Sequence, residues 1–164
     1  MSQRNKYIYG ASTWLWCMFI YSLSADTGTV SGGKSMMIAE TIERIFRAVF
    51  GTIFTYDAYA FAFSVSHIMR KCGHMAEFAV LAVLLTLLAR SISGRLLKLL
   101  PFICTVIYAA SDEIHQAFVP GRGPGVGDVI IDAAGAAIGI MIICKYLKST
   151  PWGAFYNGKL KMES

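Results

Sequence analysis

The stretch YAASDEIHQAFVPGRGPGVGDVIIDAAGAAIG, from Tyr108 to Gly139, decides the fold because it joins two apolar segments through a turn dense in charge. Its charged and strongly polar side chains are Asp112, Glu113, His115, Gln116, Arg122, Asp128 and Asp132. Ionisable groups are costly to hold beside membrane-grade hydrophobic residues, so they usually mark a functional site. The stretch therefore predicts two membrane helices with a polar site at the end where they are joined.

The composition of the whole chain is that of a membrane protein. Of its 164 residues, 55% are hydrophobic and 15% are charged, whereas a soluble domain carries about 25% charged residues. This length suits a single domain, residues 1–164. The net charge of +5 does not indicate a nucleic-acid partner, because the basic residues occur in small groups between apolar runs. The predicted partner is the lipid bilayer.

Four apolar runs predict an all-α fold, a polytopic transmembrane helical bundle. The predicted spans are 7–24, 74–89, 96–118 and 128–146. The extracytoplasmic region 25–70 is predicted to hold a polar loop over 25–33 and then an amphipathic helix over 34–50. The aromatic run 52–68 leaves a fifth span open, and the first run leaves a cleaved signal peptide open.

Basic residues lie at the amino terminus, in the loop after the second span and in the tail. They are Arg4, Lys6, Arg90, Arg95, Lys98, Lys145, Lys148, Lys159 and Lys161. Because Lys and Arg are enriched in cytoplasmic loops, we predict a multi-pass protein of the cell membrane with both termini cytoplasmic. Five basic residues on the other side oppose this orientation: Lys34, Arg44, Arg47, Arg70 and Lys71.

Three spans carry ionisable residues at one depth. Counting ~1.5 Å per helical residue from the basic residue at the cytoplasmic end of each span places Glu77, Asp112 and Asp132 roughly 20 Å along it. Helical spacing gives each span one polar stripe. The stripes are Lys71, His74 and Glu77; Tyr108, Asp112, His115 and Gln116; and Asp128, Asp132, Gly135 and Gly139. We expect one polar cluster between these spans that opens outward.

The polar cluster supplies all candidate site residues. The candidate catalytic residues are His74, Glu77, Asp112, Glu113, His115 and Asp132, and the candidate substrate-binding residues are Arg70, Lys71, Tyr108, Gln116, Arg122 and Asp128. Five carboxylates against three cations require protonated carboxyls, ionised histidines or a bound cation. A divalent metal is therefore a candidate cofactor, although no specific ligand motif indicates one. A structural salt-bridge network, and a helix N-cap role for Asp128, are the alternatives.

The turn 120–127 is rich in glycine and contains Arg122, a composition typical of a phosphate cradle at a helix start. No strand precedes it, so a P-loop or a dinucleotide-binding turn is excluded. His67 falls outside the three stripes and is expected to be an interfacial residue.

Three motifs resemble the VanZ-like family of small bacterial membrane proteins. They are RKCGHMAEFAVL (70–81), YAASDEIHQAFVPGR (108–122) and DVIIDAAGAAIG (128–139), and the segment YSLSADTG (21–28) is similar as well. The resemblance covers most of residues 8–147. It implies a helical membrane protein of the bacterial cell envelope. The family takes its name from a protein that confers low-level resistance to the glycopeptide teicoplanin, so antibiotic resistance is the implied role.

Three functions are compatible with these residues. The first is a membrane-embedded hydrolase or transferase at the outer leaflet, acting on a lipid-linked or envelope substrate. His74 or His115 would be its acid or base, and Arg122 would bind an anionic headgroup. The second is a non-catalytic protein that binds a lipidated ligand, such as a lipoglycopeptide, or a lipid-linked cell-wall precursor. The third is a proton or ion pathway, which the apolar inner halves of the spans disfavour.

Overall fold

The computed structural model describes residues 3–51, 55–123 and 125–149, and within these ranges it contains five α-helices and no strand. The helices are α1 (Gln3–Ser24), α2 (Gly28–Phe50), α3 (Ala58–Ser93), α4 (Leu99–Gln116) and α5 (Val126–Ser149). The predicted all-α fold is confirmed. The tail with Lys159 and Lys161 lies outside the described residues, as do residues 52–54 of the aromatic run.

The longest helix, α3, has a defined start and a defined end. The Asp57 carboxylate accepts hydrogen bonds from the N–H groups of Tyr59 and Ala60 at 2.9 and 3.1 Å, which satisfies two donors of the first turn. Gly94 follows the last turn with φ of 69°, the left-handed conformation that glycine adopts without strain. Between these caps the helix runs for 36 residues without interruption.

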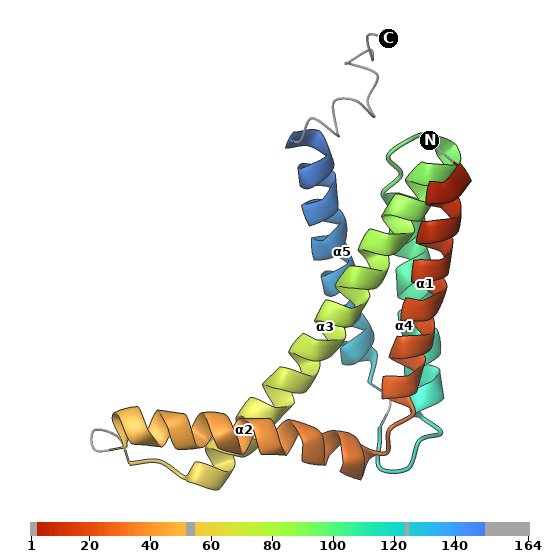
Figure 1. The fold of residues 1–164 in the computed structure, drawn as a ribbon. Helices are drawn as coiled ribbons and strands as arrows, with labels where there is room; N and C mark the ends of the chain where they lie inside the picture. Colours follow the sequence, from red (N-terminus) through yellow and green to blue (C-terminus); the bar gives the residue numbers. More distant parts are fainter. Residues whose placement is uncertain (1–2, 52–54, 124, 150–164) are drawn as a thin grey trace.

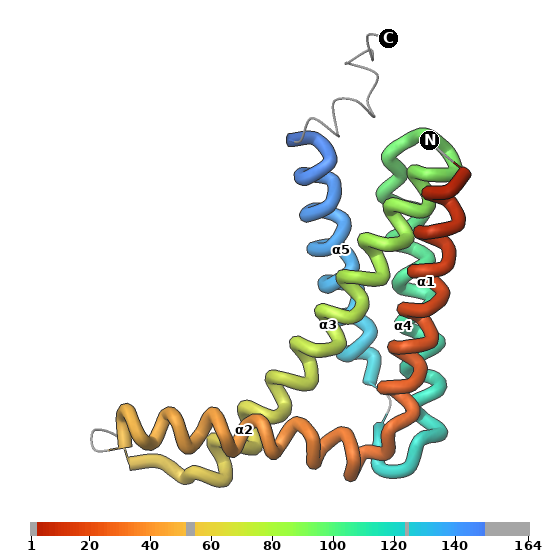
Figure 2. The backbone as a smooth tube through the Cα atoms, in the orientation of Figure 1, coloured from red at the N-terminus to blue at the C-terminus, as the bar shows by residue number. Residues whose placement is uncertain are grey.

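Four helices form a bundle and the remaining one lies across its end. α1, α4, α5 and the second half of α3 stand beside one another, whereas α2 and the first half of α3 form an arm that points away from them (Figures 1 and 2). α1 begins and α5 ends at the same end of the bundle (Figure 1). The chain therefore passes along the bundle four times, and α1 and α4 both end where α5 begins.

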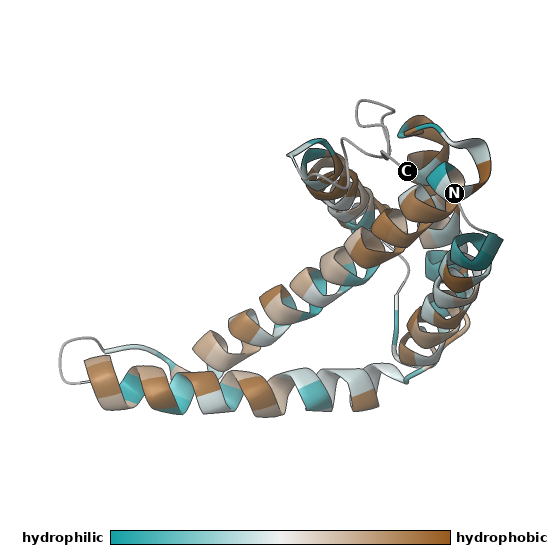
Figure 3. Cartoon of the chain, turned by 45° about the horizontal axis from the view of Figure 1, so that its top comes forward, coloured by the Kyte–Doolittle hydropathy of each residue, from teal (hydrophilic) through white to brown (hydrophobic). Residues whose placement is uncertain are grey.

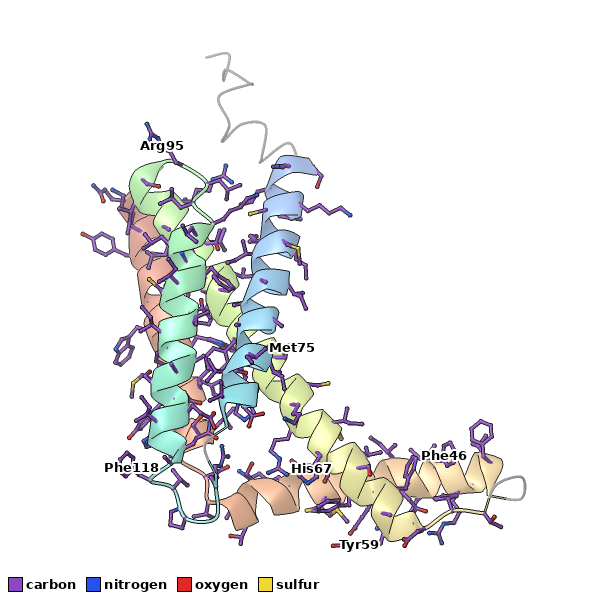
Figure 4. All side chains as sticks on the ribbon, turned by 180° about the vertical axis from the view of Figure 1, so that it is seen from behind. Phe46, Tyr59, His67, Met75, Arg95 and Phe118 are labelled. Atoms are coloured by element: carbon purple, nitrogen blue, oxygen red, sulfur yellow. The ribbon has the colours of Figure 1, made fainter. Side chains whose placement is uncertain are left out.

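Helices α3 and α5 pack with their backbones in close contact because α5 carries two glycines on the contact face. A Cβ atom at Gly135 would collide with the Met75 carbonyl, and one at Gly139 would collide with the Ala79 carbonyl. Met75 lies against α5 in Figure 4. Small residues spaced by four allow this approach between membrane helices, so the predicted glycine stripe is the surface that fixes α5 on α3.

The interior is small and the exterior is largely apolar. One core cluster joins α1, α3 and α4 through Ile20, Phe78, Leu81 and Ala109. The other joins α3 and α5 through Ala82, Ala136, Ile140 and Cys144. Large apolar side chains remain exposed along the bundle, for example Ile107 at 64% and Ile130 at 64%, and apolar residues are spread over the helices in Figure 3. Contact with lipid would cover this surface.

Two helices of the described chain, α3 and α5, are long and apolar enough to cross a membrane. α1 and α4 stand beside them but are richer in polar residues. With 18 residues, α4 is ~27 Å long, close to the ~30 Å of a hydrocarbon core. Spans for α1 and α4 stay predictions.

Three details of the expected organisation were wrong. Residues 28–33, expected in a loop, are the first turns of α2, because Thr27 caps the helix before them. Residues 58–68 of the aromatic run are not a separate span but the start of α3. Asp128 is not an N-cap, because α5 begins two residues before it, and its carboxylate instead lies in the first turn. A negative charge there is favoured by the helix dipole.

Candidate functional site

The polar cluster lies at the end of the bundle where α1 and α4 end, α5 begins and α3 passes towards the arm. Phe118, which follows α4, marks this end in Figure 4, and Arg95 marks the opposite end. The turn between α4 and α5 is held against the start of α2. Gly28 donates a backbone hydrogen bond to the Pro120 carbonyl at 3.0 Å, and a Cβ at Gly28 would collide with Gly121. Backbone contact therefore closes one side of the cluster.

The carboxylates of α4 are buried and engaged. Asp112 is 5% exposed, and its Oδ2 accepts hydrogen bonds from Ser24 Oγ at 2.8 Å and from Gln116 Nε2 at 2.7 Å. Glu113 accepts a hydrogen bond from the Gly125 N–H at 2.6 Å. The glycine-rich turn therefore does bind an anion through its backbone, as its composition suggested, but that anion is the protein's own Glu113.

The residues of α3 face those of α5. Lys71 Nζ forms an ion pair with Asp128 Oδ1 at 2.8 Å across the two helices. His74 Nδ1 lies 3.9 Å from Glu77 Oε2, one turn along the same helix. Asp132 is 3% exposed, and its Oδ1 has no hydrogen-bond partner among the described residues. Glu77 Oε2 and His115 Nε2 are buried without such a partner as well.

Two hollows of about 240 and 220 Å³ open beside the cluster, and we call them together the cationic cavity. Arg70, His74 and Arg122 line both. The larger also contacts Asp26, Lys34 and Glu77, and the smaller contacts His67, Lys71, Gln116 and Asp128. The two lysines of the cationic cavity form ion pairs with Asp26 and Asp128, and the guanidinium groups of Arg70 and Arg122 suit an anion.

Seven of the twelve predicted site residues line the cationic cavity: Arg70, Lys71, His74, Glu77, Gln116, Arg122 and Asp128. Asp112, Glu113 and Asp132 are buried and do not line it. His115 packs against the Tyr21 ring, with 4.6 Å between ring centroids. Tyr108 donates a hydrogen bond to the Cys17 carbonyl at 2.7 Å. The structure thus separates side chains at the cavity from side chains that support them.

Sequence reasoning missed three residues of this region. His67 lines the cavity, and its spacing of seven residues before His74 already placed it on the same face of a helix. Asp26 and Lys34 also line the cavity and form an ion pair at 2.7 Å. No pattern in the sequence indicated that α2 would bring Lys34 here.

Within residues 3–51, 55–123 and 125–149, no three His, Cys, Asp or Glu side chains converge in an arrangement that could hold a metal ion. His74 and Glu77, 3.9 Å apart, are a histidine–carboxylate pair of the kind that serves in acid–base chemistry.

Comparison with known proteins locates the chain in a family. Neither the curated proteins nor the solved structures contain a significant match to it. A family model described as VanZ/LLP1 matches residues 9–148. The match includes all of α2, α3 and α4, most of α1 and α5, and every residue of the polar cluster. The chain belongs to the VanZ-like family.

Proposed function

We propose that this chain is a four-span protein of the bacterial cell membrane whose cationic cavity binds the anionic headgroup of a lipid-linked envelope substrate at the outer leaflet. One observation carries the proposal: the His74–Glu77 pair lines the same cavity as two arginines, Arg70 and Arg122. An arginine presents several N–H donors in a planar fork that suits phosphate and carboxylate. A histidine beside them supplies an acid–base group.

The proposed orientation follows from charge. The end of the bundle away from the cavity carries the basic residues after α3 and at the end of α5, which the positive-inside rule places in the cytoplasm. The cavity then opens on the other side of the membrane. α2 lies crosswise at that end (Figure 1) and carries exposed apolar residues such as Met37 and Ile45. A helix of this kind lies in the membrane interface, where lipid headgroups are found.

The proposed chemistry is hydrolysis or group transfer at a headgroup ester or phosphate. His74 would take a proton from the attacking water or hydroxyl, and Glu77 would orient its imidazole. Arg70 and Arg122 would hold the anion and balance the charge that develops on it. Buried Asp112 and Asp132 would lie behind the reacting groups and contribute to the electrostatic environment of the site.

A biological role in teicoplanin resistance accords with this site. Teicoplanin is lipid-anchored and acts on cell-wall precursors outside the membrane, so a protein that alters or binds those precursors would reduce its effect. A non-catalytic binder of the same lipid-linked ligand is the second candidate. The exposed apolar face of α2 favours it, because it offers a lipid-facing surface beside the cavity.

The first test combines resistance with lipid analysis in one bacterial host. We expect expression of the chain to raise the inhibitory concentration of teicoplanin and to change the extractable envelope lipids. His74→Ala, Glu77→Gln and Arg122→Ala should each abolish both effects at normal protein levels. Arg95→Ala, an exposed arginine at the opposite end, is the matched control and should keep both.

Two results separate the candidates. If His74→Ala removes the lipid change but the purified variant still binds a polyprenyl phosphate, the site is catalytic. If His74→Ala keeps resistance while Arg122→Ala loses both binding and resistance, the protein is a binder. Full activity of all three variants would contradict any role for the cationic cavity.

A further inference from the structure

Among the described residues, the charged side chains at the end of the bundle opposite the polar cluster are all basic. The described carboxylate residues are Asp26, Glu40, Glu43, Asp57, Glu77, Asp112, Glu113, Asp128 and Asp132. They lie on α2, before α3, or at the level of the polar cluster. The opposite end carries Lys6, Arg95, Lys98, Lys145 and Lys148 without any of them. A surface so strongly cationic attracts anions.

Two hollows meet at this end, between the start of α4 and the end of α5. The first, of about 430 Å³, is lined by Lys98, Met141, Cys144, Lys145, Lys148 and Ser149. The second, of about 320 Å³, is lined by Lys98 and by the apolar residues Leu99, Phe102, Ala137, Ile140 and Met141. Lys98 and Met141 belong to both, so a polar compartment continues directly into an apolar one.

We infer that this groove binds one anionic phospholipid from the leaflet on the α4-start side of the membrane. Its phosphate lies among the three lysines, and one acyl chain runs down the apolar hollow between α4 and α5. Basic pockets between membrane helices are known sites for acidic lipid headgroups. The site is separate from the cationic cavity, and the inference does not depend on the proposed function.

Three further features fit an anionic lipid at this groove. Leu99 and Met141, at 70% and 61% exposed, leave the apolar hollow open to the surrounding membrane. Lys98, the N-cap residue of α4, makes no side-chain hydrogen bond to the first turn, and the start of a helix favours an anion. Lys145 and Lys148 occupy the last turns of α5, where a cation is favoured by the helix dipole.

The test measures lipid retention by the purified full chain. Native mass spectrometry would count phosphatidylglycerol and phosphatidylcholine molecules that remain bound from mixed micelles. We expect wild type to prefer phosphatidylglycerol about a hundredfold, since each of the three lysines at an anionic lipid surface changes affinity by about fivefold. The double substitution K98Q/K145Q should reduce the preference to about fivefold. The charge-matched double substitution K6Q/R95Q should keep the wild-type preference.

A second variant covers the case in which K98Q/K145Q fails to fold. Met141→Trp keeps every charge but narrows the apolar hollow, so it should weaken phosphatidylglycerol retention several-fold. Soluble glycerol phosphate at the same concentration should not displace the lipid. Equal retention of the two lipids by wild type would overturn the inference, as would equal loss in K6Q/R95Q, unchanged binding by Met141→Trp, or displacement by glycerol phosphate.

Discussion

Asp112 is the residue at which α1 and α4 are joined. Its Oδ2 accepts two hydrogen bonds, one from Ser24 at the end of α1 and one from Gln116 one turn further along α4. All three side chains are at least nine-tenths buried. Hydrogen bonds to a buried charged group contribute more to stability than neutral ones, and their loss leaves donors without partners. The carboxylate therefore has a structural role as well as a place in the cluster.

Replacing this residue tests that role directly. Asp112→Ala should lower the free energy of unfolding by about 1–3 kcal/mol, because the buried Ser24 hydroxyl loses its acceptor and the buried Gln116 amide keeps only its 3.5 Å contact with Ser24 Oγ. Thermal unfolding of purified protein in detergent would measure it as a lower Tm. Ser111→Ala, at the exposed neighbouring position, is the control and should change little. An unchanged Tm for Asp112→Ala would contradict the structural role.

At the scale of elements, the pairing of α3 and α5 depends on backbone contact. Gly135 and Gly139 sit against the carbonyl groups of Met75 and Ala79, two positions one turn apart on α3. Larger residues would separate the helices and, with them, the Lys71–Asp128 ion pair across the same interface. The helix pair thus sets the geometry of the cavity wall.

A glycine-to-alanine pair of substitutions isolates this contact. Gly139→Ala should destabilise the protein by about 1–3 kcal/mol, because the added methyl overpacks a backbone contact. Gly10→Ala makes the same chemical change on α1, where the nearest atom is 4.0 Å away, and should be neutral or slightly stabilising. The Tm values of the two variants, measured in the same detergent, show whether close backbone packing stabilises the α3–α5 pair. If Gly139→Ala matched Gly10→Ala, close packing would not be what holds α5.

The whole molecule has two parts, a bundle and an arm, and the arm has its own polar contact. Glu43 on α2 is 6% exposed and accepts hydrogen bonds from Arg47 at 2.6 and 2.9 Å and from Tyr56 at 3.0 Å. Phe46 stacks on Phe61 beside it, with 5.0 Å between ring centroids. These contacts tie the end of α2 to the start of α3, and we expect the arm to open without unfolding of the bundle.

The Glu43 contact makes the arm sensitive to acid. The hydrogen bonds from the Arg47 guanidinium lower the pKa of Glu43 below its ordinary value, against the opposing effect of burial. Its stabilisation is therefore complete above the ordinary glutamate pKa of about 4.3 and is lost as the pH falls through the lowered pKa. Hydrogen-exchange protection factors in the second half of α2 should fall in that window while those of α4 persist.

Two variants complete this prediction. Glu43→Gln should reduce the hydrogen-exchange protection of α2 at neutral pH, and this protection should no longer fall when the pH is lowered. Glu40→Gln disrupts an exposed ion pair with Arg44, 4.0 Å apart. It should change neither the hydrogen-exchange protection of α2 at neutral pH nor the loss of that protection in acid, because exposed ion pairs contribute little to stability. Parallel loss of protection in the arm and the bundle would show that the two do not open separately.

Much of the cluster's membership could be predicted because depth in a membrane helix is nearly a linear count along the chain. Glu77, Asp112 and Asp132 are separated by similar numbers of residues from the basic residue at the other end of their helices. Helical periodicity then indicated which residues share a helix face with each of them. The GxxxG pair on the fourth predicted span likewise pointed to close packing before any partner was known. The predicted groups lie in the region where three helices meet.

The pairings could not be predicted, because they depend on how the helices rotate against one another. Lys71 pairs with Asp128 instead of Glu77. Glu113 accepts a hydrogen bond from the backbone N–H of Gly125, in the turn after α4. Asp112 accepts one from Ser24, which lies on α1, eighty-eight residues earlier in the sequence. His67 and Lys34 reached the cavity only through the path of α3 and α2.

The sequence by itself determined the class, the helices and the position of the charges along each helix, because hydrophobic periodicity and charge placement are local properties of each segment. Only the tertiary structure decided which carboxylates support the site and which side chains open into the cationic cavity. Those outcomes follow from backbone contacts at Gly135, Gly139 and Gly28 that set helix rotation and spacing. If one helix were rotated about its axis, residues that are now buried would line the cavity and cavity-lining residues would be buried. The rotation of a helix is not encoded in any local sequence pattern.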